Sequence, residues 1–224
     1  MHKNYACIYN VSEKHYFITF DSIMDISNHL LDSDHIDIID TPKKGDAFQE
    51  GFPDTIIIHY TAGGSAQSAI HTFTESNIEA SAHVVIEKDG SITQLVPFDT
   101  IAWHAGRSAY GDRSWFNKYS IGIEIVNAGR LDKSGSEFVS WFGKSYTENE
   151  VIRAVHRNEE EPTYWHRYTE DQISAAYELC SDLIQNYGIK QILGHEEISP
   201  GRKIDPGPAF PLDKLRDKLL HGDR

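Results

Sequence analysis

The run Thr55-Ile56-Ile57-Ile58-His59 is short, continuous and rich in β-branched residues. A strand that is buried on both faces has this pattern, because neither of its faces needs polar side chains. Pro53 precedes the run and Gly63-Gly64 follows it, so the chain can turn at both ends. We therefore predict a central strand here, followed by a helix that begins near Ser65.

Three further strands are predicted along the chain. Residues 82–87 and 92–96 flank Asp89-Gly90, a dipeptide typical of tight hairpin turns. Residues 120–126 carry isoleucine at every second position, which is the period of a strand. A short apolar run at 191–193 is expected to be the last strand of the sheet.

Helical patterns alternate with these strands. The clearest extends from about Glu170 to Tyr187, where apolar side chains recur at helical spacing. Thr169 and Gln172 form a capping box at its start, and Gly188 is expected to end it. A last amphipathic helix is expected at 212–220. The alternation predicts an α/β protein with a central mixed β-sheet flanked by helices.

Residues 1–48 have a different pattern, which predicts a small N-terminal ββαβ appendage. Alternating residues between Tyr5 and Phe20 indicate a hairpin, and residues 22–31 carry apolar side chains at helical spacing. Residues 36–39 are expected to form a short strand, and Lys43 to Asp46 a linker.

The main domain is expected to cover residues 49–224, with an aromatic-rich insertion at about 130–168. This segment is too aromatic for a plain linker. Two interpretations remain open: a folded excursion that packs on the domain surface, or a wall of a substrate groove.

The composition excludes several classes of protein. The chain has 224 residues, of which 39% are hydrophobic and 25% charged, as in an ordinary globular protein. Its formal net charge of -13 repels phosphate groups, so neither nucleic acid nor an anionic membrane surface is an expected partner. Cys7 and Cys180 have no metal-ligand spacing and are expected to be free thiols.

Two histidines follow apolar runs, His59 after the central strand and His195 after the strand at 191–193. If these strands are parallel neighbours, both imidazoles emerge at one edge of the sheet, where α/β proteins place their sites. Asp205 follows ten residues after His195, in a loop stiffened by Pro206 and Pro208. Two histidines and one carboxylate form a catalytic zinc set. The alternative is structural histidines, since the chain has 12 of them.

Two charged side chains are candidates for chemistry beside such a metal. Lys203 lies two residues before Asp205, so both project to one side of an extended segment, where an ammonium can hold an oxyanion. Glu124 lies on the strand face opposite the isoleucines, where a carboxylate near a metal can move protons. The alternative for Glu124 is an ordinary solvent-facing strand residue.

Five separated motifs occur in the chain in this order: Ile57–Ala62, Ser81–His83, Ala102–Gly106, Ser120–Glu124, and the block from Gly194-His195 through Pro200–Phe210. Together they resemble the zinc-dependent N-acetylmuramoyl-L-alanine amidases of the type-2 group. This family includes anhydro-muropeptide amidases and is related to peptidoglycan recognition proteins. The resemblance covers about residues 53–218.

The resemblance implies a role for each matched residue. His59, His195 and Asp205 would bind one Zn²⁺ per chain, Glu124 would be the acid/base residue, and Lys203 would stabilise the transition state. The candidate substrate contacts are Trp103, His104, His83 and Arg202.

The implied reaction is hydrolysis of the amide bond between N-acetylmuramic acid, or its 1,6-anhydro form, and L-alanine of a peptidoglycan stem peptide. Muropeptides or peptidoglycan fragments would be the partners. The alternatives are a non-catalytic peptidoglycan receptor and a metallohydrolase of another acyl-amino-acid amide. No apolar run resembles a signal peptide, so a cytoplasmic address is expected, with delivery by phage lysis or a secretion system as the alternative.

Overall fold

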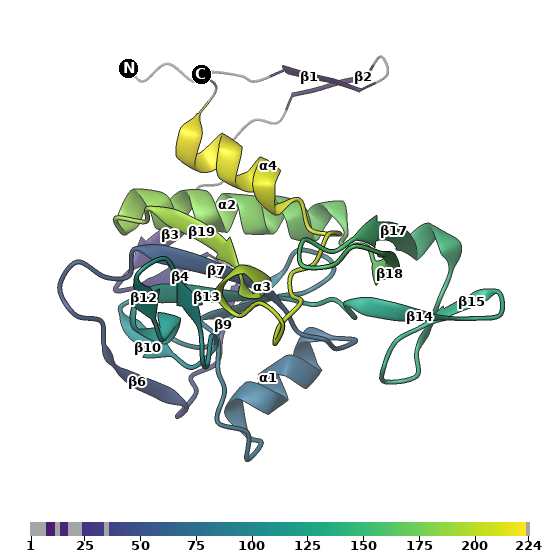
Figure 1. The fold of residues 1–224 in the computed structure, drawn as a ribbon. Coiled ribbons are helices and arrows are strands. Elements are labelled where there is room, and N and C mark those ends of the chain that lie inside the picture. Colours follow the sequence, from purple (N-terminus) through teal and green to yellow (C-terminus); the bar gives the residue numbers. More distant parts are fainter. Residues whose placement is uncertain (1–7, 12–13, 18–23, 34–35, 223–224) are drawn as a thin grey trace.

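A six-stranded mixed sheet lies at the centre of the computed structural model, which describes residues 8–11, 14–17, 24–33 and 36–222 (Figure 1). The strand β7 is parallel to both of its neighbours, β13 and β19, and β8 is antiparallel to β9. The predicted mixed α/β sheet is therefore confirmed. In spatial order its strands are β19 (Gln191–Gly194), β7 (Thr55–Tyr60), β13 (Ser120–Ile125), β8 (Val84–Ile86), β9 (Ile92–Gln94) and β5 (Ile36–Ile38).

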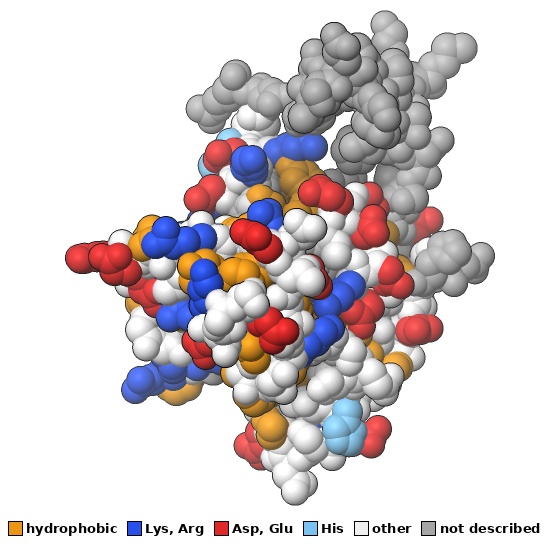
Figure 2. Space-filling model, turned by 90° about the vertical axis from the view of Figure 1, so that its right-hand side faces the viewer, with side chains coloured by type: hydrophobic (Ala, Val, Ile, Leu, Met, Phe, Trp, Pro, Cys, Tyr) orange, Lys and Arg blue, Asp and Glu red, His pale blue; other side chains and the backbone are white. Residues whose placement is uncertain are grey.

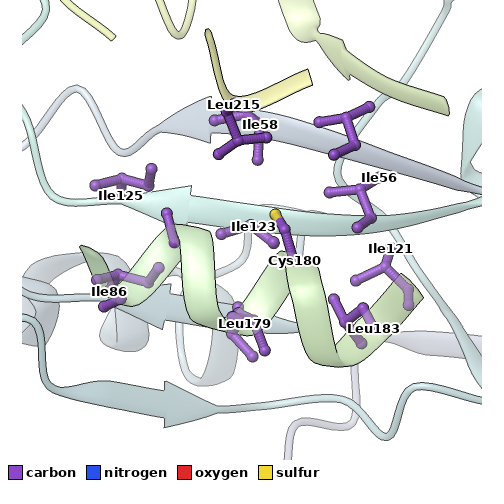
Figure 3. Packing of buried hydrophobic residues seen from close by; sticks show 14 of the residues in the cluster. Ile56, Ile58, Ile86, Ile121, Ile123, Ile125, Leu179, Cys180, Leu183 and Leu215 are labelled. Carbon is purple, nitrogen blue, oxygen red and sulfur yellow. The ribbon is translucent and has the colours of Figure 1, made fainter. Parts of the chain in front are cut away.

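Helices cover both faces of this sheet. Leu179, Cys180 and Leu183 of α2 (Glu170–Asn186) pack against the isoleucines of β7 and β13, and Leu215 of α4 (Leu212–Arg216) lies near Ile58 (Figure 3). On the other face, α1 (Ala66–Thr74) packs its apolar side chains against Val85 and Val126. Each fully buried side chain of this size stabilises the fold by about 1.5–3 kcal/mol. The continuous apolar run of β7 is buried on both faces, so this free energy favours a position for β7 inside the sheet, between β19 and β13.

The helix ends agree with the sequence. The Thr169 hydroxyl accepts from the Gln172 backbone N–H, and the Gln172 side chain accepts from Thr169, so the predicted capping box is confirmed. Ser65 caps α1. The predicted last helix is α4, which continues as the π-helical turn η3 (Asp217–His221). None of the described helices is both long and apolar enough to cross a membrane.

The helix predicted at 22–31 is wrong for the residues that are described. β3 (Asp25–Ser27) and β4 (Leu30–Asp32) form a hairpin instead. Asn28 and His29 take left-handed φ angles of 51° and 65°, which suit a two-residue hairpin turn. Leu31 is buried in the main core, and its N–H donates to the Gln94 side chain. This tertiary contact outweighs the local helical spacing.

Other parts of the N-terminal segment belong to sheets. The hairpin predicted within 5–20 is present where it is described, as β1 (Ile8–Val11) and β2 (Lys14–Phe17). The linker predicted at Lys43 to Asp46 is wrong, because β6 (Lys44–Ala47) pairs with β10 (Thr100–Ala102). Strand β5 joins the central sheet beside β9. Among the N-terminal residues that the structure describes, the ββαβ pattern of the expected appendage is therefore not formed.

The insertion is a folded five-stranded sheet with its own apolar cluster, so the prediction of a folded excursion is confirmed. It projects from one side of the molecule in Figure 1, and on the face seen in Figure 2 basic, acidic and hydrophobic side chains are intermixed. Its strands, in spatial order, are β16 (Ser145–Tyr146), β15 (Glu137–Val139), β14 (Arg130–Ser134), β18 (Pro162–His166) and β17 (Val151–Val155).

The remaining short elements are β11 (Ala109–Tyr110), β12 (Arg113–Ser114), η1 (Phe116–Lys118), η2 (Glu148–Glu150) and α3 (His195–Ile198).

Candidate metal centre

His59, His195 and Asp205 converge at one end of the parallel strands. His59 lies near the end of β7, and His195 follows β19 directly. Because the two strands are parallel and in register, both residues lie at the same edge of the sheet. The His59 and His195 Nδ1 atoms are 2.9 Å apart, and each lies 3.0 Å from Asp205 Oδ2. All three residues are buried. The structure thus brings together the three ligands proposed from the sequence, although they are scattered over nearly 150 positions.

The hydrogen positions on the imidazoles follow from their outer neighbours. His104 Nε2 lies 3.1 Å from the Ser120 carbonyl, which can only accept, so this nitrogen carries the hydrogen. His104 Nδ1 then accepts from His59 Nε2, 2.9 Å away. His195 Nε2 lies 3.1 Å from the Ala105 carbonyl and 3.3 Å from Arg202 Nη2. Because the carbonyl is the nearer of the two and the Arg202 group already donates to it at 2.9 Å, we assign the hydrogen to Nε2. Both Nδ1 atoms therefore present lone pairs toward Asp205.

This arrangement suits a divalent metal ion. Burial and the neighbouring His195 lower the pKa of His59 to about 4, so its imidazole is neutral at pH 7. Burial alone would raise the pKa of Asp205, but its contacts with His195 and His59 keep that pKa below the ordinary value. Two bare nitrogens and a carboxylate oxygen that face one another repel unless a cation lies between them. The donor set therefore fits a metal, which the buried cluster could hold.

Glu124 and Lys203 border the same site. Glu124 is opposite His59 in the register of β13 and β7, and its Oε2 is buried without a hydrogen-bond partner among the described residues. Burial and the charge of Asp205 raise the pKa of Glu124 to about 8, while Lys203 opposes the shift. A carboxylate with this pKa exchanges protons near neutral pH.

A cavity of about 630 Å³ opens over the ligands. Of the residues proposed from the sequence, Glu124, Lys203, Trp103, His104 and Arg202 line it together with His195 and Asp205. The insertion contributes Trp141 and Phe142 to the lining, so it is also a wall of this cavity.

Arg202 also holds two loops together at the cavity. Its Nη2 donates to the Ala105 and Arg107 carbonyls, at 2.9 and 2.8 Å. These bonds tie the loop that follows β10 to the loop that carries Lys203.

The structure places His83 outside the cavity lining. Its Nε2 donates to the Thr100 carbonyl at 2.9 Å, and its Nδ1 accepts the Gly122 N–H at 3.0 Å. The side chain is fully buried, and burial lowers its pKa to about 4. His83 therefore joins strands beneath the site and has no free ring nitrogen for a substrate.

A family profile described as N-acetylmuramoyl-L-alanine amidase matches residues 49–208. The chain belongs to this amidase family.

Two curated relatives from Escherichia coli (strain K12) agree with this assignment. The chain is 33% identical over 169 residues to N-acetylmuramoyl-L-alanine amidase AmiD, which covers 71% of the chain and 51% of AmiD. It is also 33% identical over 141 residues to 1,6-anhydro-N-acetylmuramyl-L-alanine amidase AmpD, which covers 63% of the chain and 59% of AmpD. The chain thus spans little more than half the length of either relative.

A solved structure of AmiD from E. coli, in complex with the substrate anhydro-N-acetylmuramic acid-L-Ala-D-γ-Glu-L-Lys, has the same fold with a TM-score of 0.56. The sequence identity is 31%, and the match covers 76% of this chain and 59% of the AmiD chain. The fold expected from the family resemblance is therefore confirmed.

One part of the candidate site was missed by the sequence analysis. Glu196, next to His195, is buried, and its Oε2 accepts from His156 Nε2 at 2.7 Å and from the Gly207 N–H at 3.1 Å. The Glu196 N–H in turn donates to the Asp205 carbonyl at 2.8 Å. His156 belongs to the segment after β17, so only the fold brings it to the metal loop. The nearest hint in the sequence was the position of Glu196 beside a proposed ligand.

Proposed function

We propose that this chain hydrolyses the amide bond between N-acetylmuramic acid, or its 1,6-anhydro form, and L-alanine of a peptidoglycan stem peptide, with one Zn²⁺ held by His59, His195 and Asp205. The observation that carries the proposal is the convergence of these three groups beside Glu124 and Lys203 in one cavity. The printed names of AmiD and AmpD, and the substrate in the AmiD complex, support the same bond.

The zinc, when bound, polarises the amide carbonyl and makes a water molecule more acidic. Glu124 accepts a proton from the attacking water and passes it to the leaving nitrogen of L-alanine. Burial and the charge of Asp205 raise the pKa of Glu124 to about 8, and a cation nearby would lower that pKa. Lys203 supplies an ammonium group that stabilises the oxyanion of the tetrahedral intermediate.

The remaining residues proposed from the sequence divide into two groups. Trp103 and Arg202 line the cavity, which supports their proposed contact with the substrate. Both ring nitrogens of His104 are engaged by His59 and Ser120, so we propose that His104 acts by orienting His59.

The reaction is tested by incubating the zinc-loaded protein with a defined muropeptide and analysing the products by mass spectrometry. We expect a free stem peptide with an L-alanine amino terminus. Muropeptide that is bound but uncut would instead support a receptor, and cleavage of unrelated acyl-amino-acid amides alone would support another metallohydrolase.

Two substitutions separate the metal from the proton transfer. Glu124→Gln keeps the volume of the side chain but cannot accept a proton, so we expect normal zinc content and a kcat that is roughly 10²–10⁴-fold lower. His195→Ala removes a ligand, so both zinc and activity should be lost. Zinc content is measured by atomic absorption. Wild-type activity of Glu124→Gln would remove this residue from the mechanism.

A further inference from the structure

Trp141 and Phe142 lie at the turn between β15 and β16 of the insertion, which the Ser140 N–H closes by donating to the Lys144 carbonyl. Both line the cavity over the metal ligands. The Trp141 side chain is 75% exposed and Phe142 is 37% exposed. Large aromatic surfaces that stay in water beside a functional cavity mark places where a ligand can bury them.

The two rings are held in place. Trp141 Nε1 donates to the Ala62 carbonyl at 2.8 Å, across 79 positions of sequence. The rings of Trp141 and Phe142 are 5.7 Å apart and nearly perpendicular, with an angle of 86° between their planes. Phe142 also lies close to Gly64. A ligand can therefore pack on a preformed aromatic surface, and binding costs little additional side-chain entropy.

The lining of the cavity differs in charge between the chain segments that contribute to it. The segment that holds the aromatic rings contributes uncharged residues: Thr61, Ala62, Gly63, Gly64, Ser68, Ala69 and Thr72. The charged side chains of the lining come from the strand and loop at the metal: Glu124, Arg202, Lys203 and Asp205. A stem peptide carries carboxylates, which favour the cationic side chains of Arg202 and Lys203. A sugar ring is uncharged, with an apolar face of C–H groups and hydroxyls that serine and threonine can bind.

We propose that Trp141 and Phe142 form a subsite for a pyranose ring of the glycan part of the substrate. This inference rests on the proposed amidase function and names the part of the substrate that the insertion binds. The ring is either the muramyl residue or the sugar attached to it, because both present the same chemistry.

The test measures affinity by calorimetry in the zinc-loaded Glu124→Gln background, which prevents turnover. The three ligands are GlcNAc-MurNAc-tetrapeptide, MurNAc-tetrapeptide and the free tetrapeptide. We expect Trp141→Ala to weaken binding of a sugar-bearing ligand about tenfold and to leave the free tetrapeptide unaffected. If Trp141→Ala loses affinity for both sugar-bearing ligands, the subsite binds the muramyl ring. If it loses affinity for the disaccharide ligand alone, the subsite binds the second sugar.

A control variant separates stacking from the bond to Ala62. Trp141→Phe keeps an aromatic face but lacks the N–H, so it should retain most of the affinity. Three outcomes would contradict the subsite. Trp141→Phe could bind the sugar-bearing ligands as weakly as Trp141→Ala does, or neither variant could change the affinity for these ligands. In the third outcome, the affinity for the free tetrapeptide would fall by the same factor. Hydrolysis by the wild-type chain is measured in parallel, and its absence would contradict the amidase function without altering these comparisons.

Discussion

Gly122 lies on β13, two residues before Glu124, and the space beside it is filled by His104. A Cβ atom at Gly122 would lie 2.3 Å from His104 Cγ and 2.6 Å from its Nδ1. Because no real contact is this short, any side chain here must displace the imidazole that orients His59.

We therefore expect Gly122→Ala to weaken zinc binding about 10–100-fold, the usual effect of losing an outer partner of a metal ligand. The strain should also lower the free energy of unfolding by about 1–3 kcal/mol. The matched control is Gly188→Ala, where an added Cβ meets no atom within 4 Å. Zinc affinity is measured by competition with a chelator, and equal affinities of the two variants would show that His104 does not orient His59.

His83 provides a prediction about pH. Its pKa is about 4 in the folded state and about 6.5 in an unfolded chain. Between these values the unfolded state binds the proton more tightly, so the stability due to neutral His83 is complete above pH 6.5 and is lost as the pH falls to 4. The stability advantage of the wild type over His83→Gln should therefore shrink by up to ~3 kcal/mol between pH 7 and pH 4. Urea unfolding at several pH values tests this, and a constant difference would contradict it.

At the scale of elements, the insertion supports the metal loop. Trp165 of β18 lies against Gly207, where an added Cβ would be 2.7 Å from the indole ring. The His156 ring stacks on Trp165 at 5.5 Å and holds Glu196 beside the ligand His195. The segment that carries the aromatic cavity wall thus also fixes the loop that carries Asp205.

We expect His156→Ala to lower the free energy of unfolding by about 1–3 kcal/mol, because the buried Glu196 loses the His156 N–H and keeps only Arg157 and the Gly207 N–H as partners. Zinc affinity should fall as well, since Glu196 is held less firmly. His71→Ala is a suitable control, because the His71 side chain is 61% exposed on α1. The measurements are urea unfolding and chelator competition. A His156→Ala variant as stable as the control would refute this link.

At the scale of the whole molecule, the metal joins segments that are far apart in the chain. Zinc that binds only the folded state should stabilise it by about 4 kcal/mol at a thousandfold excess over its Kd. The melting temperature should therefore fall on chelation and rise again when zinc is restored. His195→Ala should show no such shift, and a wild-type melting temperature that is insensitive to zinc would argue against the metal site.

The sequence by itself determined the central strands and the start of α2, because these depend on local patterns: a continuous β-branched run and a capping box of four residues, from Thr169 to Gln172. It also indicated the site, since His59 and His195 each follow a buried strand and the parallel register of β7 and β19 brings such positions to one edge.

Only the tertiary structure decided the rest. The spacing at 22–31 is compatible with a helix, yet the burial of Leu31 and its bond to Gln94 select a hairpin. Lys44 to Ala47 has no strong strand pattern and becomes a strand because β10 offers a partner. The contacts of His156 with Glu196 and of Trp141 with Ala62 join residues 40 and 79 positions apart. Local propensity does not encode such pairings, because their free energy arises only when the packed core has brought the segments together.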